Sequence, residues 1–145
     1  MIEICTDQEM QALGATSIAQ LEPPGVIYLE GDLGAGKTTW VRGALQSLGI
    51  TQSIKSPTYT LVESYEALGT TFHHFDLYRL SDPEELDFIG IREYFAANSI
   101  CLIEWPARGI GMIPAANLEI QIDYGNSCRR VHFSGEWAGR LALTT

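Results

Sequence analysis

The amino-acid sequence predicts an α/β fold of three layers, with a mostly parallel central sheet that carries antiparallel additions. Short apolar runs typical of buried strands occupy residues 26–29 and 100–103, and a glycine-rich loop with a helical pattern follows the first run. A segment that alternates apolar and polar residues at 118–124, with an expected partner at 130–133, predicts an antiparallel edge. Because strands and helices mix along 145 residues without a linker or repeat, we expect a single domain over residues 1–145.

The other elements follow from the spacing of apolar residues and from turn residues. Pro23, Pro24 and Gly25 end an amphipathic N-terminal segment, and Asp82 followed by Pro83 is typical of a helix start. These patterns predict helices over residues 7–21 and 39–48, strands over 59–65 and 70–77 around a turn at 67–69, and short helices over 83–87 and 91–97.

The composition bounds the class of protein and its partners. With 46% hydrophobic and 19% charged residues, the chain has the make-up of a globular protein. Its formal net charge of −9 argues against tight, unaided binding to a nucleic-acid backbone, while work on RNA within a complex stays open. No apolar run reaches the roughly 18 residues that a membrane span needs, and the N-terminus lacks a signal-peptide pattern, so no membrane partner is expected.

The three cysteines, Cys5, Cys101 and Cys128, are scattered along the chain. This spacing predicts neither a metal-binding pair nor a disulfide framework. Cys101 lies in an apolar run and is expected to be a small core residue. Together with the N-terminal sequence, this pattern predicts a cytoplasmic protein in reducing surroundings.

The most informative segment is Gly31–Thr38, which fits the pattern G-x-x-x-x-G-K-[ST] of the phosphate-binding loop of P-loop NTPases. Its glycines let the backbone turn tightly and direct N–H groups at a phosphate, and Lys37 can reach the β- and γ-phosphates. The Thr38 hydroxyl can bind the magnesium ion that accompanies ATP. A strand before the loop and a helix after it favour an anion at the helix N-terminus, so we expect a fold of P-loop NTPase type. The expected ligands are ATP and Mg²⁺, bound by Asp32, Leu33, Gly34, Ala35, Gly36, Lys37, Thr38 and Thr39.

An ATPase of this type also needs an acidic residue for magnesium at the end of a buried strand. Glu104 directly follows the second apolar run, and Asp76 ends a strand of its own. We predict Thr38, Glu104 and Asp76 as metal ligands, and Lys37, Asp76 and Glu104 as catalytic residues. The sequence leaves open which acid holds the metal and which orients the attacking water, and whether either is only a solvated strand end or a turn residue.

The segment between the phosphate-binding loop and Asp76 has two interpretations. Its position matches the switch I loop of GTPases, in which a hydroxyl responds to the γ-phosphate. Thr58 or Thr60 could have that role here. Alternatively, these hydroxyls cap a turn before a strand.

Other residues that suggest chemistry have plainer interpretations. His73 and His74 are neighbours and so face opposite sides of a strand, which argues against a metal site built from the two alone. The pair Arg129–Arg130 is expected to be a solvated edge rather than a phosphate clamp. Trp105 could pack in the core or lie exposed beside the site.

Four segments together resemble the TsaE family, also called YjeE, from about residue 25 to residue 124. They are the phosphate-binding loop, Ser56–Glu63, His74–Leu80 and Ile103–Pro106, in the order and at the spacing of that family. The resemblance implies a small, cytoplasmic bacterial P-loop ATPase with weak activity of its own. It would act with the TsaB and TsaD subunits in threonylcarbamoyl modification of adenosine in tRNA, and would contact tRNA indirectly through that complex.

The same resemblance implies roles for individual residues. Thr38 and Glu104 would be metal ligands, Asp76 an essential acid and Lys37 the phosphate contact. The N-terminal segment around Thr6 would lie near the nucleotide base.

Two alternatives stay open on the sequence, a small-molecule kinase and a nucleotide switch that does not hydrolyse its ligand. Such kinases usually carry an arginine-rich lid, and the arginines here are scattered. A GTPase-like switch would read guanine through an Asn/Thr-Lys-x-Asp motif, and neither Lys37 nor Lys55 stands in one.

Overall fold

The sheet at the centre of the molecule has seven strands in the order β1-β7-β6-β2-β5-β4-β3. The structure is a computed structural model and describes residues 1–142 of the chain. Strands β6, β2, β5 and β4 run parallel, and β1, β7 and β3 are each antiparallel to a neighbour. This topology confirms the prediction of an α/β fold of P-loop NTPase type with a mostly parallel centre and antiparallel additions. The elements are β1 (Ile2–Ile4), α1 (Asp7–Ile18), β2 (Gly25–Glu30), α2 (Lys37–Ser47), β3 (Val62–Ala67), β4 (Thr70–Asp76), η1 (Pro83–Ile89), η2 (Ile91–Tyr94), β5 (Ser99–Glu104), η3 (Pro106–Gly109), β6 (Leu118–Tyr124), β7 (Arg129–Ser134) and η4 (Ala138–Arg140).

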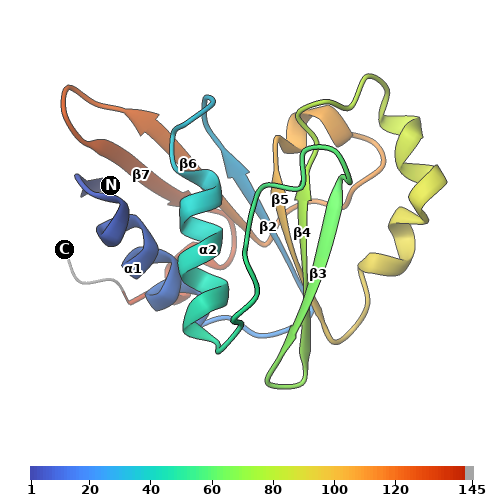
Figure 1. Cartoon of the computed structure of the whole chain (residues 1–145), viewed down its shortest axis with the longest axis horizontal. Coiled ribbons are helices and arrows are strands. Elements are labelled where there is room, and N and C mark those ends of the chain that lie inside the picture. The colour runs from blue at the N-terminus through green and yellow to red at the C-terminus, as the bar shows by residue number, and fades with distance from the viewer. Residues whose placement is uncertain (143–145) are drawn as a thin grey trace.

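Helices α1 and α2 cover one face of the sheet, and the short 3₁₀ segments η1 and η2 lie on the other side, which gives three layers (Figure 1). Alternate residues of β2 pack into two separate cores. Ile27 and Leu29 belong to the core under the helices, whereas Val26 and Tyr28 belong to the core on the opposite face. Because both faces of the central strands β2 and β5 are covered, these two strands appear in the sequence as nearly uninterrupted apolar runs.

The two α-helices pack directly against each other through glycines. A Cβ atom added at Gly14 would lie 2.1 Å from the carbonyl oxygen of Trp40, and one added at Gly43 would lie 2.2 Å from that of Gln11. Neither position has room for a side chain, so glycine at both positions permits the close approach of the helices.

The chain before β3 turns where an extended strand was predicted. The strand begins at Val62 rather than at residue 59. Leu61 has a left-handed backbone conformation with φ of 70°, and its N–H donates to the carbonyl oxygen of Pro57 at 2.8 Å. A left-handed residue interrupts an extended chain, so the β-type residues before Val62 form a turn instead.

The region predicted as two short helices forms 3₁₀ turns. The first of these segments, η1, starts where predicted, because Asp82 and Glu85 make both hydrogen bonds of a capping box. Gly90, with φ of 68°, then separates η1 from η2. The first predicted helix also ends earlier, at Ile18. Among residues 1–142, every helix is too short or too polar to span a membrane.

The prediction that the cysteines form no disulfide is wrong for two of the three. Cys5 and Cys128 are bonded although 123 positions separate them in the sequence. Strand β1 pairs with β7 so that Ile4 stands opposite Arg129, and the next residues along, Cys5 and Cys128, meet. The spacing of cysteines could not predict this contact, because it arises only when the first strand joins the sheet beside the last. Cys101 is free and buried, as predicted.

Gly43→Ala is expected to lower the free energy of unfolding by about 1–3 kcal/mol, because the new methyl group would overlap the backbone of Gln11. At an open helix position the same change would raise stability by about 1 kcal/mol through helix propensity. Chemical denaturation followed by circular dichroism measures the difference. Gly139→Ala is the matched control, since nothing lies within 4 Å of a Cβ atom there. Equal stabilities of the two variants would contradict the close helix contact.

Thiol alkylation tests the disulfide. The folded protein should take up no label without a reductant, because Cys5 and Cys128 are bonded and burial raises the pKa of the Cys101 thiol to about 12, which suppresses its thiolate. Mass spectrometry should find one label after unfolding without a reductant, and three after unfolding with one. Three labels in the unreduced sample would show that the protein carries free thiols, as a reducing compartment would maintain them.

Candidate nucleotide-binding site

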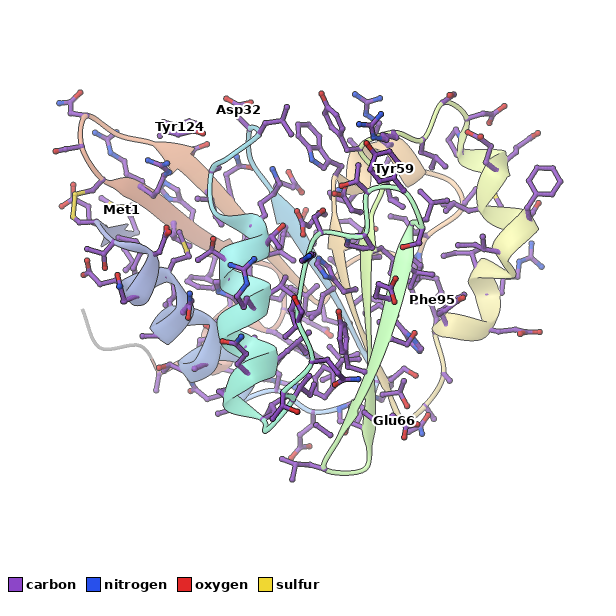
Figure 2. The ribbon with its side chains drawn as sticks, viewed as in Figure 1. Met1, Asp32, Tyr59, Glu66, Phe95 and Tyr124 are labelled. Atoms are coloured by element: carbon purple, nitrogen blue, oxygen red, sulfur yellow. A yellow bond between two sulfur atoms is a disulfide. The ribbon has the colours of Figure 1, made fainter. Side chains whose placement is uncertain are left out.

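Three parallel strands, β2, β5 and β4, end at the same edge of the sheet, and a cavity of about 570 Å³ opens there. Strand β2 leads into the loop Gly31–Thr38, β5 ends with Glu104, and β4 ends with Asp76. The strand register places Asp76 beside Glu104. Figure 2 shows Asp32 at this end of the sheet and Glu66 at the opposite end. The topology thus brings the predicted loop and both predicted acids to one place.

The glycine loop has the tight backbone that its sequence predicts. Gly31, Gly34 and Gly36 have φ values of 151°, 77° and 117°, where side chains rarely fit. A Cβ atom at Gly31 would also lie 2.4 Å from the carbonyl oxygen of Ile122. Helix α2 begins at Lys37, within the last two residues of the loop, so the unpaired N–H groups of its first turn lie at the cavity.

The Lys37 side chain is buried, with 5% of its surface exposed. Its ammonium group donates to carbonyl oxygens of its own loop, including that of Asp32 at 2.9 Å, and lies 4.4 Å from the ring centroid of Trp105. Burial lowers the pKa of Lys37, and the carboxylates of Glu104, Asp76 and Asp32 oppose that shift. Because loop carbonyls are neutral partners, an anionic ligand would hold this ammonium group more strongly.

Two side chains hold the carboxylate of Glu104, which is 3% exposed. The Thr38 hydroxyl lies 3.1 and 2.9 Å from its two oxygens and donates to them. The fully buried His74 donates from Nε2 to Oε2 at 2.6 Å. The Nδ1 atom of His74 has no partner among the described residues, so the tautomer with its hydrogen on Nε2 suits the site. His74 was not among the predicted site residues, although its position two residues before Asp76 places both side chains on one side of the strand.

Asp76 organises the segment that precedes β3. Its carboxylate accepts hydrogen bonds from Ser56, from Thr58 at 3.2 Å and from the backbone N–H of Tyr78 at 3.0 Å. Of the two hydroxyls considered as phosphate sensors, Thr58 lines the cavity, whereas Thr60 bonds a glutamate side chain at the surface. The structure therefore favours Thr58 as the hydroxyl that could respond to a ligand.

The donor set of Thr38, Glu104 and Asp76 consists of oxygen atoms only, which suits a small, hard cation such as Mg²⁺. Within residues 1–142, no group of three or more His, Cys, Asp or Glu side chains is arranged to hold a metal by itself. A magnesium ion here would take its remaining ligands from phosphate and water. The residues thus fit a cation that arrives with a nucleotide better than a resident structural metal.

The structure also shows where the histidine pair, Trp105 and the Thr6 segment lie. His73 faces away from His74 and shares a hydrogen bond of 2.6 Å between Nδ1 and the Ser64 hydroxyl, and burial lowers its pKa. Trp105 is half-buried and lines the cavity rather than lying in the core alone. The Thr6 segment, which the resemblance placed near the base, also lines the cavity.

The prediction that Arg129 belongs to a solvated edge is wrong. Its guanidinium group donates to the carbonyl oxygens of Ala35 at 3.1 Å and Gly34 at 3.3 Å, both in the glycine loop. Tyr124, across the hairpin, also donates to the loop. Arg130 is exposed, as expected. No local pattern identifies these contacts, because they need the strand order that sets β6 and β7 beside the loop.

The site lies within a sequence that matches a known family. The family model described as threonylcarbamoyl adenosine biosynthesis protein TsaE matches residues 4–131. The chain belongs to the TsaE family. The match includes every residue that lines the cavity, from Ile4 to Arg129, so the whole site lies in the part that the TsaE family shares.

Individual TsaE relatives and a solved structure agree with this assignment. The Haemophilus influenzae protein named tRNA threonylcarbamoyladenosine biosynthesis protein TsaE is 57% identical over 106 residues, which cover 73% of this chain and 67% of that protein. The Bacillus subtilis protein of the same name is 37% identical over 128 residues, covering 88% of this chain and 80% of that protein. The crystal structure of Bacillus subtilis YdiB superposes with a TM-score of 0.76 at 31% identity, over 91% of this chain and 82% of YdiB.

His74→Ala is expected to lower the free energy of unfolding by about 3 kcal/mol, because it leaves Glu104 buried without its closest donor. His74→Gln keeps an N–H donor of similar reach and should recover most of the loss. His73→Ala, on the same strand, is the matched control and should cost less than about 1 kcal/mol, since His73 is half-buried and bonded to a neutral hydroxyl. Urea denaturation provides the comparison, and equal losses at the two positions would contradict the role given to the His74–Glu104 bond.

Proposed function

We propose that this TsaE-family protein binds ATP with Mg²⁺ and hydrolyses it weakly, as a subunit that works with TsaB and TsaD in threonylcarbamoyl modification of adenosine in tRNA. The observation that carries the proposal is the convergence of Lys37, Thr38, Asp76 and Glu104 on one cavity beside a glycine loop. The names of the relatives, which refer to tRNA threonylcarbamoyladenosine biosynthesis, support the pathway.

The loop and the helix that follows it would bind the phosphates. Lys37 would exchange its carbonyl partners for phosphate oxygens, and the N–H groups at the start of α2 would donate to the same ligand. Thr38 and Glu104 would hold Mg²⁺, and the carboxylate of Asp76 would lie next to the ion. Once bound, that ion would neutralise negative charge on the phosphates.

The hydrogen bonds support different roles for the two acids. Glu104 shares its carboxylate with Thr38, the hydroxyl assigned to the cation, so we assign Glu104 as the metal ligand. Asp76 instead holds Ser56 and Thr58 and lies beside Glu104 in the strand register. We assign Asp76 to orienting the attacking water and to linking the segment before β3 with the γ-phosphate.

The surface charge supports an indirect route to RNA. A formal net charge of −9 makes tight, unaided binding to a polyanion unfavourable, so tRNA would be held by the partner subunits. A cytoplasmic location belongs to the same proposal. In a reducing cytoplasm the bond between Cys5 and Cys128 would open to two thiols.

Lys37→Ala should weaken binding of ATP with magnesium by about 10- to 100-fold, the effect of losing charge-assisted hydrogen bonds of about 1.5–3 kcal/mol. Isothermal titration calorimetry measures the dissociation constant, and circular dichroism checks the fold. Lys55→Ala is the matched control, because Lys55 is exposed, is the other lysine of the chain, and does not line the cavity. Equal affinities for the two variants would remove the basis of the nucleotide site.

A reconstituted modification reaction tests the pathway. With TsaB, TsaD and tRNA, the wild-type protein and Lys55→Ala should support many rounds of modification, and Lys37→Ala should not. If TsaB and TsaD modified tRNA fully over many turnovers without this protein, the proposed function would be wrong.

A further inference from the structure

We propose that Arg129 and Tyr124 are positioning residues that set the conformation of the phosphate-binding loop. They act from the antiparallel hairpin of β6 and β7, outside the loop motif. The inference rests on the proposed function, because it explains how the loop would be prepared for a phosphate before one binds. It extends that function to residues that the motif does not include.

The contacts cover three successive carbonyl groups of the loop. The Tyr124 hydroxyl donates to the oxygen of Leu33 at 2.6 Å. Arg129 donates from Nη2 to the oxygen of Gly34 at 3.3 Å and from Nε to that of Ala35 at 3.1 Å. The three carbonyl groups of the loop that face the hairpin are therefore all held by donors from that one hairpin.

The planar trans peptide links these contacts to phosphate binding. In a trans peptide the carbonyl and the N–H of the next residue point in opposite directions. Holding the oxygens of Leu33 and Ala35 toward the hairpin directs the N–H groups of Gly34 and Gly36 away from it, and both glycines line the cavity. The intervening N–H, on Ala35, is bonded inside the loop to the oxygen of Asp32 at 3.1 Å.

The residue types suit this task. Arginine presents its N–H groups in a rigid, planar fork that suits two neighbouring carbonyls and fixes their relative position, whereas the N–H groups of lysine rotate on a flexible stem. Arg129 and Tyr124 are cross-strand partners, and the guanidinium group lies 4.2 Å from the tyrosine ring centroid, so each supports the other. While the bond between Cys5 and Cys128 is intact, it also anchors this end of the hairpin next to Arg129, but the contacts of Arg129 and Tyr124 do not require it.

A glycine loop needs such support because glycine has more backbone freedom than any other residue. Ordering it at the moment of binding would cost affinity, and external hydrogen bonds reduce that cost beforehand. The positioning residues thus prepare the loop in the nucleotide-free protein.

Two conservative variants test the proposal. Tyr124→Phe removes only a hydroxyl, and Tyr124 does not line the cavity; Arg129→Lys keeps the charge and removes the fork. Arg130→Lys is the matched control, since Arg130 is the exposed neighbour on β7. Hydrogen exchange of the nucleotide-free protein, followed by mass spectrometry, reports on the peptide that covers residues 31–38. Calorimetry reports the affinity for ATP and ADP with magnesium.

Both variants should exchange faster in the loop, with unchanged exchange in α1, and should bind each nucleotide about 3- to 10-fold more weakly, the effect of one lost hydrogen bond. Arg130→Lys should match the wild type in both measurements. These results would support the proposal, because a general loss of stability would also raise exchange in α1.

Other results would overturn it. Unchanged loop exchange in both variants would do so, and a loss of affinity confined to Arg129→Lys without faster exchange would make Arg129 a direct ligand contact. Faster exchange with unchanged affinity would show that loop order does not matter for binding. If the wild-type protein bound no nucleotide, the proposed function would fail, while loop exchange in the nucleotide-free protein would still show whether the hairpin orders the loop.

Discussion

The parallel pairing of β2, β5 and β4 is the constraint on which the rest of the site depends. Its register sets Glu104 between Leu29 on one neighbouring strand and Asp76 on the other. Because side chains alternate along a strand, His74 falls on the same side as Asp76 and reaches the Glu104 carboxylate. A slip of one residue would turn one of these groups to the opposite face of the sheet. The register of these strands therefore fixes the positions of both acids, Glu104 and Asp76, and of His74, the buried donor that orients Glu104.

Patterns within short segments of the sequence were enough to predict the features that depend on those segments alone. The loop Gly31–Thr38 needs glycine for its backbone angles, and β5 is apolar because both its faces are covered, so each is visible in the sequence. The bond between Cys5 and Cys128 and the contact of Arg129 with the loop could not be predicted. The disulfide depends on β1 lying beside β7, and the Arg129 contact depends on β6 lying beside β2, next to the loop; only the folded sheet sets these two pairings. The chemical roles of the site residues stay predictions.

Under the proposed function, the acidic residues at the site would explain why a nucleotide binds there together with a cation. Lys37 is buried among the carboxylates of Glu104, Asp76 and Asp32. A triphosphate alone would place negative charge beside the carboxylates of Glu104 and Asp76, in a protein with a formal net charge of −9. A divalent cation between the phosphates and the acids would remove that repulsion, so the acids would favour the nucleotide–cation pair over the free nucleotide.

The disulfide also determines how the molecule carries mechanical load. When Cys5 and Cys128 are bonded, tension applied at Met1 and at Ala142 passes from β1 across the bond into β7. Residues 6–127 then lie outside the path of the force, and they include the glycine loop, both α-helices and all four parallel strands. When the bond is open, the same tension acts on the pairing of β1 with β7 and then on α1, beside the cavity. The redox state of Cys5 and Cys128 therefore decides whether tension at the ends of this chain reaches the proposed nucleotide site.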